Sequence, residues 1–564
     1  MEKFKDLAYK RPDKTAVTAQ LTALVDKLEA VQSYDEFKAV YMEIEELTSK
    51  VWTMCTIASV RNTLNTQDEF YETESMGLDR MLAELMPLTK RMNEIVLNSP
   101  YCKEFGEEYG TILIDSIQAE LRTQDKSIIP LKIEESELCQ AYSKSAAACK
   151  TEFMGEECNF YGLLKHMQNP DRSIRKKAFE AWSKLYEGAS ADLDAQYDKL
   201  IDLRIKMAEK LGMKNFTELA YLGKGRFDYG PTDVAKFRKQ VLEVITPAVA
   251  ELRKKQAERI GVDKLKFYDE TFMFSDGNAD PIGGKDVLVP IASKMYHEMS
   301  PETGEFFDFM TTYELFDLET RPGKHLGGYC TWLPEYKAPF IFSNFNGTSG
   351  DVDVLTHEAG HAFQAYTALR CQPLTALCGS TSEINEIHSM AMEHFAYPWM
   401  KDFYGEENVK KAKYAHLADA LSSMPYIVCV DEFQHRIYEN PNMSAMERRT
   451  VWREIEQRYM PWRDYDGDEF CENGGFWMQK QHIFLYPFYY IDYSLAQTCA
   501  FELYGRMKND PEAAWQDYLR LCKAGGSLGY FDLLKVARLS NPFVEGNVEK
   551  AVRHVIDELN SYEF

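Results

Sequence analysis

The sequence has no apolar run that approaches the roughly 18 residues a helix needs to cross a bilayer. Its N-terminal segment also has no apolar core after the first lysines, so we expect no secretory signal. The twelve cysteines are scattered without a CxxC pair, which is typical of single reduced thiols. These absences predict a cytoplasmic protein that does not enter a membrane.

An excess of basic residues is absent as well. Lys and Arg number 65 against 89 Asp and Glu, which gives a formal net charge of −24. Because an acidic surface repels phosphates and anionic lipids, we expect neither nucleic acid nor a membrane surface as a partner. The hydrophobic share of 45% and the charged share of 27% are close to globular averages and predict a folded protein. The composition indicates no oligomeric state.

No internal repeat, low-complexity tract or Gly/Ser linker interrupts the chain. Apolar residues recur at spacings of three and four in most segments, which predicts a mainly helical protein. The predicted helices are residues 17–31, 34–60, 76–97, 173–211, 232–260, 408–438, 511–523 and 547–560. Ser173 is the expected N-cap of the fourth helix, and Gly230-Pro231 marks the start of the next. At 564 residues we expect two or more domains or lobes, with a boundary near residues 165–172.

The region from about residue 262 to 350 has a different pattern. Short β-prone runs, Lys266 to Phe274 and Phe340 to Phe345, lie between glycines and prolines. We therefore expect a small β-sheet in this region, just before the motif described next.

Residues 354–366, VLTHEAGHAFQAY, contain His357, Glu358 and His361 in the order H-E-x-x-H. The apolar residues of this segment have helical spacing, so the two histidines lie on one helix face, one turn apart, and can reach one ion. Zinc accepts imidazole ligands, and a catalytic zinc keeps one position for water. Glu358 lies about 100° round the helix from His357, where it can act as a base without binding the metal. The alternative is a buried helix whose two histidines make ordinary hydrogen bonds.

Glycines and capping residues surround the motif. Gly347, Ser349, Gly350 and Asp351 precede it as turn and cap residues. Gly360 lies inside the helix, where glycine costs about 1 kcal/mol relative to alanine. We expect another element to pack closely against that position.

The third metal ligand must come from elsewhere in the chain. The nearest carboxylate-rich helix, SEINEIHSMAMEHFAY, places Glu383, Glu386 and Glu393 on one face, while His388 points away from Glu386. We select Glu386, although spacing alone hardly separates it from Glu383. The remaining carboxylates, together with Asp353, could orient the histidines, and a solvent-facing or salt-bridged role is equally open.

Three separated segments resemble one known family. NFNGTSGDVDVLTHEAGHAF, then EINEIHSMAMEHF, then HIFLYPFYYIDYSLA at residues 482–496 resemble the oligoendopeptidase F branch of the thimet oligopeptidase (M3) family. The resemblance implies a mainly α fold with two helical lobes flanking a deep substrate channel. It also implies a small β-sheet next to the zinc-binding H-E-x-x-H helix. The chain would then consist of an N-terminal helical region, residues 1–170, and a catalytic peptidase domain, residues 171–564.

The resemblance also implies roles for individual residues. Glu386 matches the third ligand of a single zinc ion. His482, Tyr486 and Tyr493 match positions that stabilise the oxyanion and contact substrate, although the loop is one residue shorter than in the thimet branch. Imidazole and phenol donors are needed there, because zinc alone only partly neutralises the developing oxyanion. The run APFIFSNF, Ala338 to Phe345, resembles the family's edge strand, on which a substrate backbone can add as another strand.

Taken together, these observations predict a zinc metalloendopeptidase that hydrolyses internal bonds of short oligopeptides. Zinc would lower the pKa of a water molecule, and Glu358 would take its proton and pass it to the leaving amine. Three alternatives stay open: a zinc exopeptidase with the same ligands, a non-catalytic protein that captures peptides, and a hydrolase of a non-peptide amide. Cobalt or manganese is compatible with the ligands, but two histidines and a glutamate with one open position suit zinc best.

Overall fold

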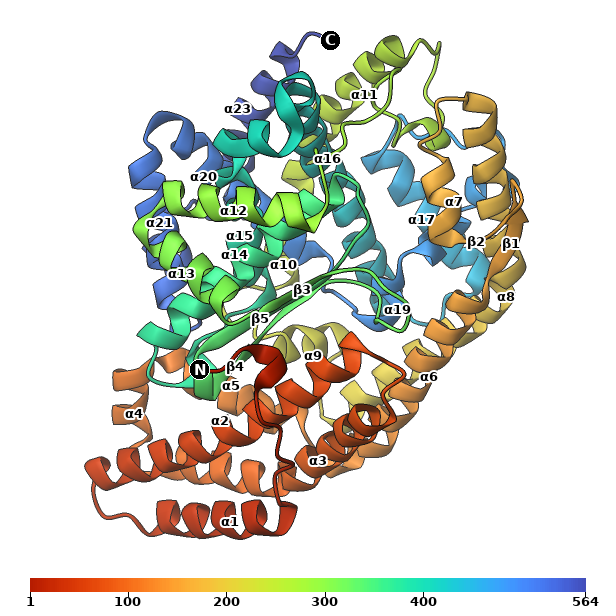
Figure 1. Cartoon of the computed structure of the whole chain (residues 1–564). Helices are drawn as coiled ribbons and strands as arrows, with labels where there is room; N and C mark the ends of the chain where they lie inside the picture. Colours follow the sequence, from red (N-terminus) through yellow and green to blue (C-terminus); the bar gives the residue numbers. More distant parts are fainter. The chain divides into compact units, whose positions relative to one another are not determined.

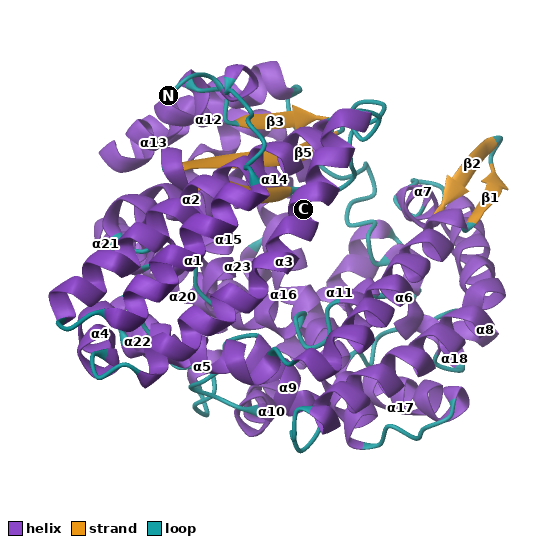
Figure 2. Cartoon of the chain, turned by 90° about the horizontal axis from the view of Figure 1, so that it is seen from below, coloured by secondary structure: helices purple, strands orange, loops and turns teal.

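The computed structural model describes residues 1–564 and divides into two compact units, each described by itself. Unit 1 comprises Met1–Leu121, Asp280–Val409 and Arg506–Ser540, and unit 2 comprises Arg122–Ala279, Lys410–Gly505 and Asn541–Phe564. Helices dominate both units, and the five strands form two small sheets (Figures 1 and 2). The prediction of a mainly α fold is confirmed. No helix combines the length and the apolar character that crossing a membrane requires.

Each helix predicted from apolar spacing is present. These helices are α1 (Lys14–Ala30), α2 (Tyr34–Leu64), α3 (Glu69–Asn98), α8 (Arg172–Lys210), α10 (Pro231–Gln240), α11 (Thr246–Ile260), α16 (Met400–Glu439), α21 (Pro511–Ala524) and α23 (Asn547–Ser561). A π-helical turn joins α10 to α11, and α16 is broken at Gly405, whose φ is 74° and ψ 170°. The predicted N-cap Ser173 is wrong. Asp171 caps α8 instead, because its carboxylate accepts a hydrogen bond from the Ser173 amide at 2.8 Å.

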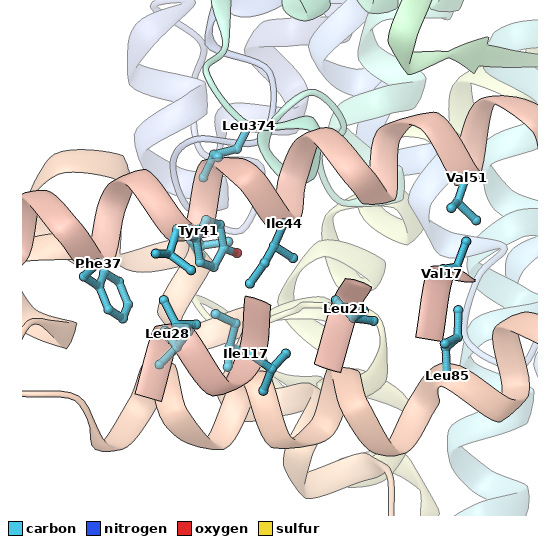
Figure 3. Close-up of a cluster of buried hydrophobic side chains, with 14 of the residues drawn as sticks. Val17, Leu21, Leu28, Phe37, Tyr41, Ile44, Val51, Leu85, Ile117 and Leu374 are labelled. Carbon is cyan, nitrogen blue, oxygen red and sulfur yellow. The ribbon is translucent and has the colours of Figure 1, made fainter. Parts of the chain in front are cut away.

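The N-terminal helices of unit 1 enclose a hydrophobic core. Figure 3 shows Leu21 and Leu28 of α1 lying near Tyr41 and Ile44 of α2. Leu374, from the segment that follows α14, belongs to the same cluster. This core therefore anchors the segment between the two helices that carry the predicted metal ligands. Unit 1 also contains α4 (Cys102–Tyr109), all but the last two residues of α5 (Thr111–Thr123), α12 (Lys285–Met299), α13 (Pro301–Thr312), α14 (Gly350–Cys371), α15 (Ser382–Phe395) and α22 (Tyr530–Val536).

A three-stranded sheet in unit 1 confirms the small sheet expected before the motif. Its strands β3 (Phe316–Glu319), β5 (Ala338–Phe345) and β4 (Tyr329–Leu333) lie in that order, with β5 parallel to β3 and antiparallel to β4. The expectation that residues 338–345 form an edge strand is wrong, because β5 is paired on both sides. The edge strand nearest to it in the sequence is β4, which is the strand that precedes β5 in the chain. Helix α14 packs against β4 and β5 (Figure 1).

Unit 2 combines helices with one hairpin. Its remaining elements are α6 (Ile129–Ala148), β1 (Lys150–Phe153), β2 (Glu156–Asn159), α7 (Phe160–His166), α9 (Phe216–Gly223), α17 (Ala445–Tyr459), α18 (Glu469–Glu472), α19 (Gln481–Leu485) and, up to Gly505, α20 (Ile491–Asn509). The β-prone run Lys266 to Phe274 forms a 3₁₀ turn and loop rather than a strand. The carboxylate of Asp269 accepts hydrogen bonds from the Lys266 amide and the buried Arg175 guanidinium, both at 3.0 Å. Because these bonds close a turn, the segment cannot extend.

Candidate metal centre

Helices α14 and α15 pack closely against each other at Gly360. A Cβ atom at this position would lie 2.6 Å from the His388 carbonyl oxygen and 2.7 Å from Cα of Ser389. The close packing predicted from this glycine is confirmed, because only a residue without a side chain permits it. The two helices thereby bring their polar side chains to one place in unit 1.

His357, His361 and Glu386 converge at this contact. Nε2 of His357 lies 3.4 Å from Oε2 of Glu386, and Nε2 of His361 lies 3.5 Å from the same oxygen. Two ligands of a tetrahedral zinc at 2.0–2.1 Å are about 3.3 Å apart. Both separations therefore suit ligands of one ion, and all three ligand atoms lie within 4.8 Å of one another.

Glu393 is one of the three glutamates that helical spacing offered as ligand candidates. Its carboxylate contacts Nδ1 of His357, the ring nitrogen that does not face Glu386. Its Oε1 lies 2.5 Å from Nδ1 of His357, as is typical of carboxylates that orient a metal-binding histidine. Burial lowers the pKa of His357, but the hydrogen bonds with Glu386 and Glu393 outweigh it and hold this pKa well above its usual value. Burial would raise the pKa of Glu386, but hydrogen bonds from the two histidines lower it overall. Glu386 is thus a carboxylate, the form that binds a metal.

The other polar residues singled out on these helices lie outside the three-ligand group. Glu383 is buried in the first turn of α15, and Asp353 lies in the first turn of α14. His388 is fully buried, and burial lowers its pKa to about 3, so its imidazole is neutral. The tertiary contacts therefore distinguish Glu386 from Glu383 as the candidate third ligand, which helical spacing alone could not do.

Glu358 lies beside the ligand group as a buried carboxyl group. Its side chain is 8% exposed, and Oε2 has no hydrogen-bond partner. Burial raises its pKa above the usual value, although the charges of His357 and His361 oppose that rise. A carboxylate with a raised pKa and an unpaired oxygen can accept a proton and return it.

The turn before α14 is fixed by Asp351. Its carboxylate accepts hydrogen bonds from the amides of Asn346 at 2.9 Å and Gly347 at 2.7 Å. Gly347 has a φ of 88°, a conformation that favours glycine. The expected turn is therefore present, while Ser349 occupies the N-cap position without a side-chain hydrogen bond.

A cavity of about 450 Å³ lies in unit 1 between α2, α3 and β4. Trp52 and Asp79 line it from the helices, and Tyr329 and Thr331 line it from the edge strand. Gly328 directly precedes β4, and a Cβ atom on it would lie 3.7 Å from Oε1 of Glu358. The edge strand therefore begins beside the carboxyl group and continues along the cavity.

The predicted substrate-contacting residues form a separate cluster in unit 2. His482 lies in α19, Tyr486 follows that helix, and Tyr493 lies in the first turn of α20. The imidazole centroid of His482 is 6.1 Å from the ring of Tyr486 and 6.4 Å from that of Tyr493. Burial, aided by the charges of Lys480 and Lys224, lowers the pKa of His482 to about 4. Its imidazole is therefore neutral near pH 7.

The loop between α19 and α20 is held at Phe488, a residue that no sequence motif singles out. Phe488 has a φ of 60°, which is unusual for a residue with a side chain. Its amide donates to the buried Gln434 side chain at 2.9 Å, and its carbonyl accepts from the Arg226 guanidinium at 2.6 Å. Arg226 also pairs with Asp492 at 2.5 Å. Both backbone groups of this residue are therefore fixed between Tyr486 and Tyr493.

Comparison with known proteins identifies the family. A model described as Peptidase family M3 matches residues 165–277 and 294–552, and one described as Peptidase M3 N-terminal domain matches residues 4–124. The chain therefore belongs to peptidase family M3.

Within this family, several of the similar proteins are named oligoendopeptidase F. A solved structure described as an oligoendopeptidase F is 43% identical, covers 100% of this chain and 99% of that chain, and has a TM-score of 0.92. The structure of PZ peptidase A with an inhibitor has the same identity and TM-score and covers 100% of both chains. An oligoendopeptidase F homolog from Borreliella burgdorferi is 26% identical over 38% of this chain and 36% of its own length. The resemblance to the oligoendopeptidase F branch is confirmed, and the chain spans 36% to 61% of the lengths of the curated relatives it matches.

Proposed function

We propose that this protein is a zinc-dependent endopeptidase that hydrolyses internal bonds of short peptides. The observation that carries the proposal is the convergence of His357, His361 and Glu386 beside the buried Glu358. Membership of family M3 supports peptidase activity, and relatives named as oligopeptidases support short peptides as substrates.

The three side chains fit one zinc ion per chain. Two imidazoles and one carboxylate, with ligand atoms 3.4 and 3.5 Å apart, form a donor set that leaves a fourth position open. Imidazole ligands favour zinc over magnesium or calcium. When bound, zinc would polarise the scissile carbonyl and lower the pKa of a water molecule.

In this proposal Glu358 moves the proton. It would accept a proton from the attacking water and deliver it to the leaving amine, and its raised pKa suits both transfers. The missing side chain at Gly328 leaves space beside this carboxyl group for a peptide backbone.

We assign hydrogen-bond donation to the substrate carbonyl to His482, Tyr486 and Tyr493. Burial lowers the pKa of His482 and keeps its imidazole neutral. The neutral ring can donate a hydrogen bond to the carbonyl oxygen without transferring a proton to it. Tyr486 is 55% exposed, which leaves its ring open to a substrate. Such donors stabilise the charge that develops on the carbonyl oxygen.

The edge strand β4 supports a peptide substrate. Its outer edge can pair with an extended peptide as an added strand, and the adjoining cavity can receive a side chain. This mode needs no free terminus and favours internal cleavage. The twelve free cysteines support a reducing compartment, and we propose the cytoplasm.

Mass-spectrometric product analysis of peptides blocked at both ends tests the proposal. The wild-type protein should cut them internally. Glu358→Gln should keep its zinc and cut nothing, whereas His361→Ala should lose the metal. Cleavage by Glu358→Gln would remove Glu358 as the base, and peptide binding without products from the wild type would favour a capture protein.

A further inference from the structure

A second group of metal-binding side chains lies in unit 2, beside the hairpin of β1 and β2. A carboxylate oxygen of Glu156, Sγ of Cys158 and a ring nitrogen of His166 all lie within 4.8 Å of one another. None of these residues belongs to the candidate metal centre, whose ligands are all in unit 1. The group therefore needs its own explanation.

The hairpin presents two of the donors on one face. Glu156 and Cys158 are two residues apart on β2, so their side chains point to the same side. The strand register pairs Phe153 with Glu156 and Thr151 with Cys158, so all four side chains share this face. The ring of Phe153 contacts the imidazole of His166, with centroids 5.0 Å apart. This contact places the imidazole over the face that carries the carboxylate and the thiol.

A short connection fixes the third donor relative to the hairpin. Asn159, the last residue of β2, caps α7 by accepting a hydrogen bond from the Gly162 amide at 2.9 Å. Cys158 is only 5% exposed and lies against Gly162, where a Cβ atom would come within 3.3 Å of its sulfur. His166 ends the same helix. The three donors thus come from one continuous segment whose turn and cap are defined.

We propose that Glu156, Cys158 and His166 bind a second divalent metal ion of the zinc type. Thiolate and imidazole ligands favour zinc or cobalt over magnesium and calcium. Tetrahedral zinc holds its ligand atoms about 3.3 to 3.6 Å apart, depending on whether a sulfur is in the pair. Donor atoms within 4.8 Å of one another therefore need to close by no more than about 1.5 Å. On binding, the Cys158 thiol releases its proton to solvent and the thiolate becomes the ligand. The ion would tie the hairpin to α7, and a fourth position left for water would make it exchangeable.

Cobalt titration of the metal-depleted full-length protein tests this site without relying on peptidase activity. A cobalt–thiolate bond gives an intense near-ultraviolet charge-transfer band, which the ligands His357, His361 and Glu386 cannot produce. The wild type should bind two equivalents of cobalt, one of which develops this band. Cys158→Ser should lose the band while peptide hydrolysis is unchanged. The matched control Cys149→Ser removes a thiol from the neighbouring end of α6 and should keep the band.

Further variants separate this inference from the proposed function. His166→Gln and Glu156→Gln should weaken cobalt binding at this site at least about tenfold, whereas Glu157→Gln, on the opposite face, should leave it unchanged. His361→Ala should keep the thiolate band even though it removes a ligand of the other centre. Absence of the band in the wild type, or its persistence in Cys158→Ser, would overturn the inference. Circular dichroism establishes that each variant is folded.

Discussion

Replacing Gly360 with alanine should separate α14 from α15 and weaken zinc binding. The new Cβ atom would lie 2.6 Å from the His388 carbonyl oxygen, whereas ordinary contact begins at 3.4 Å, so the helices must move apart by about 0.8 Å. Metal–ligand distances tolerate changes of about 0.2 Å. Because two ligands lie on α14 and one on α15, this displacement exceeds the tolerance of the site. We expect zinc affinity to fall at least about tenfold.

The Gly360→Ala substitution should also lower the free energy of unfolding. Alanine gains about 1 kcal/mol of helix propensity, but overpacking costs about 1–3 kcal/mol, so the free energy of unfolding should fall by up to about 2 kcal/mol. Gly188 is the matched control, because it is exposed within α8 and a Cβ atom there meets nothing within 4 Å. Gly188→Ala should raise the free energy of unfolding by up to about 1 kcal/mol and leave zinc affinity unchanged.

Chelator competition measures the zinc affinity of both variants, and urea unfolding measures their stability. If Gly360→Ala bound zinc like the wild type and were stabilised like Gly188→Ala, the reasoning about the helix contact would be refuted.

Three other predictions concern Glu393 at the candidate metal centre and Gln434 and His435 beside Phe488. Glu393→Gln should weaken zinc binding by about 10–100-fold, because His357 loses the carboxylate that orients it; unchanged affinity in chelator competition would contradict that role. Gln434→Ala should lower kcat more than it changes KM and reduce the free energy of unfolding by about 1–3 kcal/mol, because the buried Phe488 amide loses its acceptor; equal changes in kcat and KM would argue against positioning. Stability should fall as pH drops from 6.5 towards about 4, because burial lowers the pKa of His435 to about 4 and the unfolded state binds the proton more readily in that range. Urea unfolding of His435→Gln should show a flatter pH profile there, and an identical profile would count against this histidine.

The candidate site was predictable where it depended on one helix. The positions of His357, Glu358 and His361 follow from helical periodicity, and Gly360 signalled a close neighbour through its low helix propensity. The two histidines and the glutamate lie within about one turn of each other, and the glycine signal is a property of a single position in the same helix. The sequence therefore carries them directly, and the structure agrees.

Relations between elements were harder to obtain from the sequence. The order of the strands made β4 the edge rather than residues 338–345, because pairing on both sides of a strand is a tertiary property. Likewise, the choice between Glu383 and Glu386 depends on how α15 is rotated against α14. Phe488 gave no signal, since a positive φ at a residue with a side chain is imposed by its surroundings, here Gln434 and Arg226.

The proposed ligands lie in unit 1, and the proposed carbonyl donors lie in unit 2. Metal content and turnover therefore report on different parts of the chain. A preparation with a full complement of zinc can still be inactive if the loop at Phe488 is disturbed, and damage confined to α15 can empty the metal site without altering the aromatic cluster. Quality control of this protein therefore needs two assays, one of metal content and one of turnover, because neither result predicts the other.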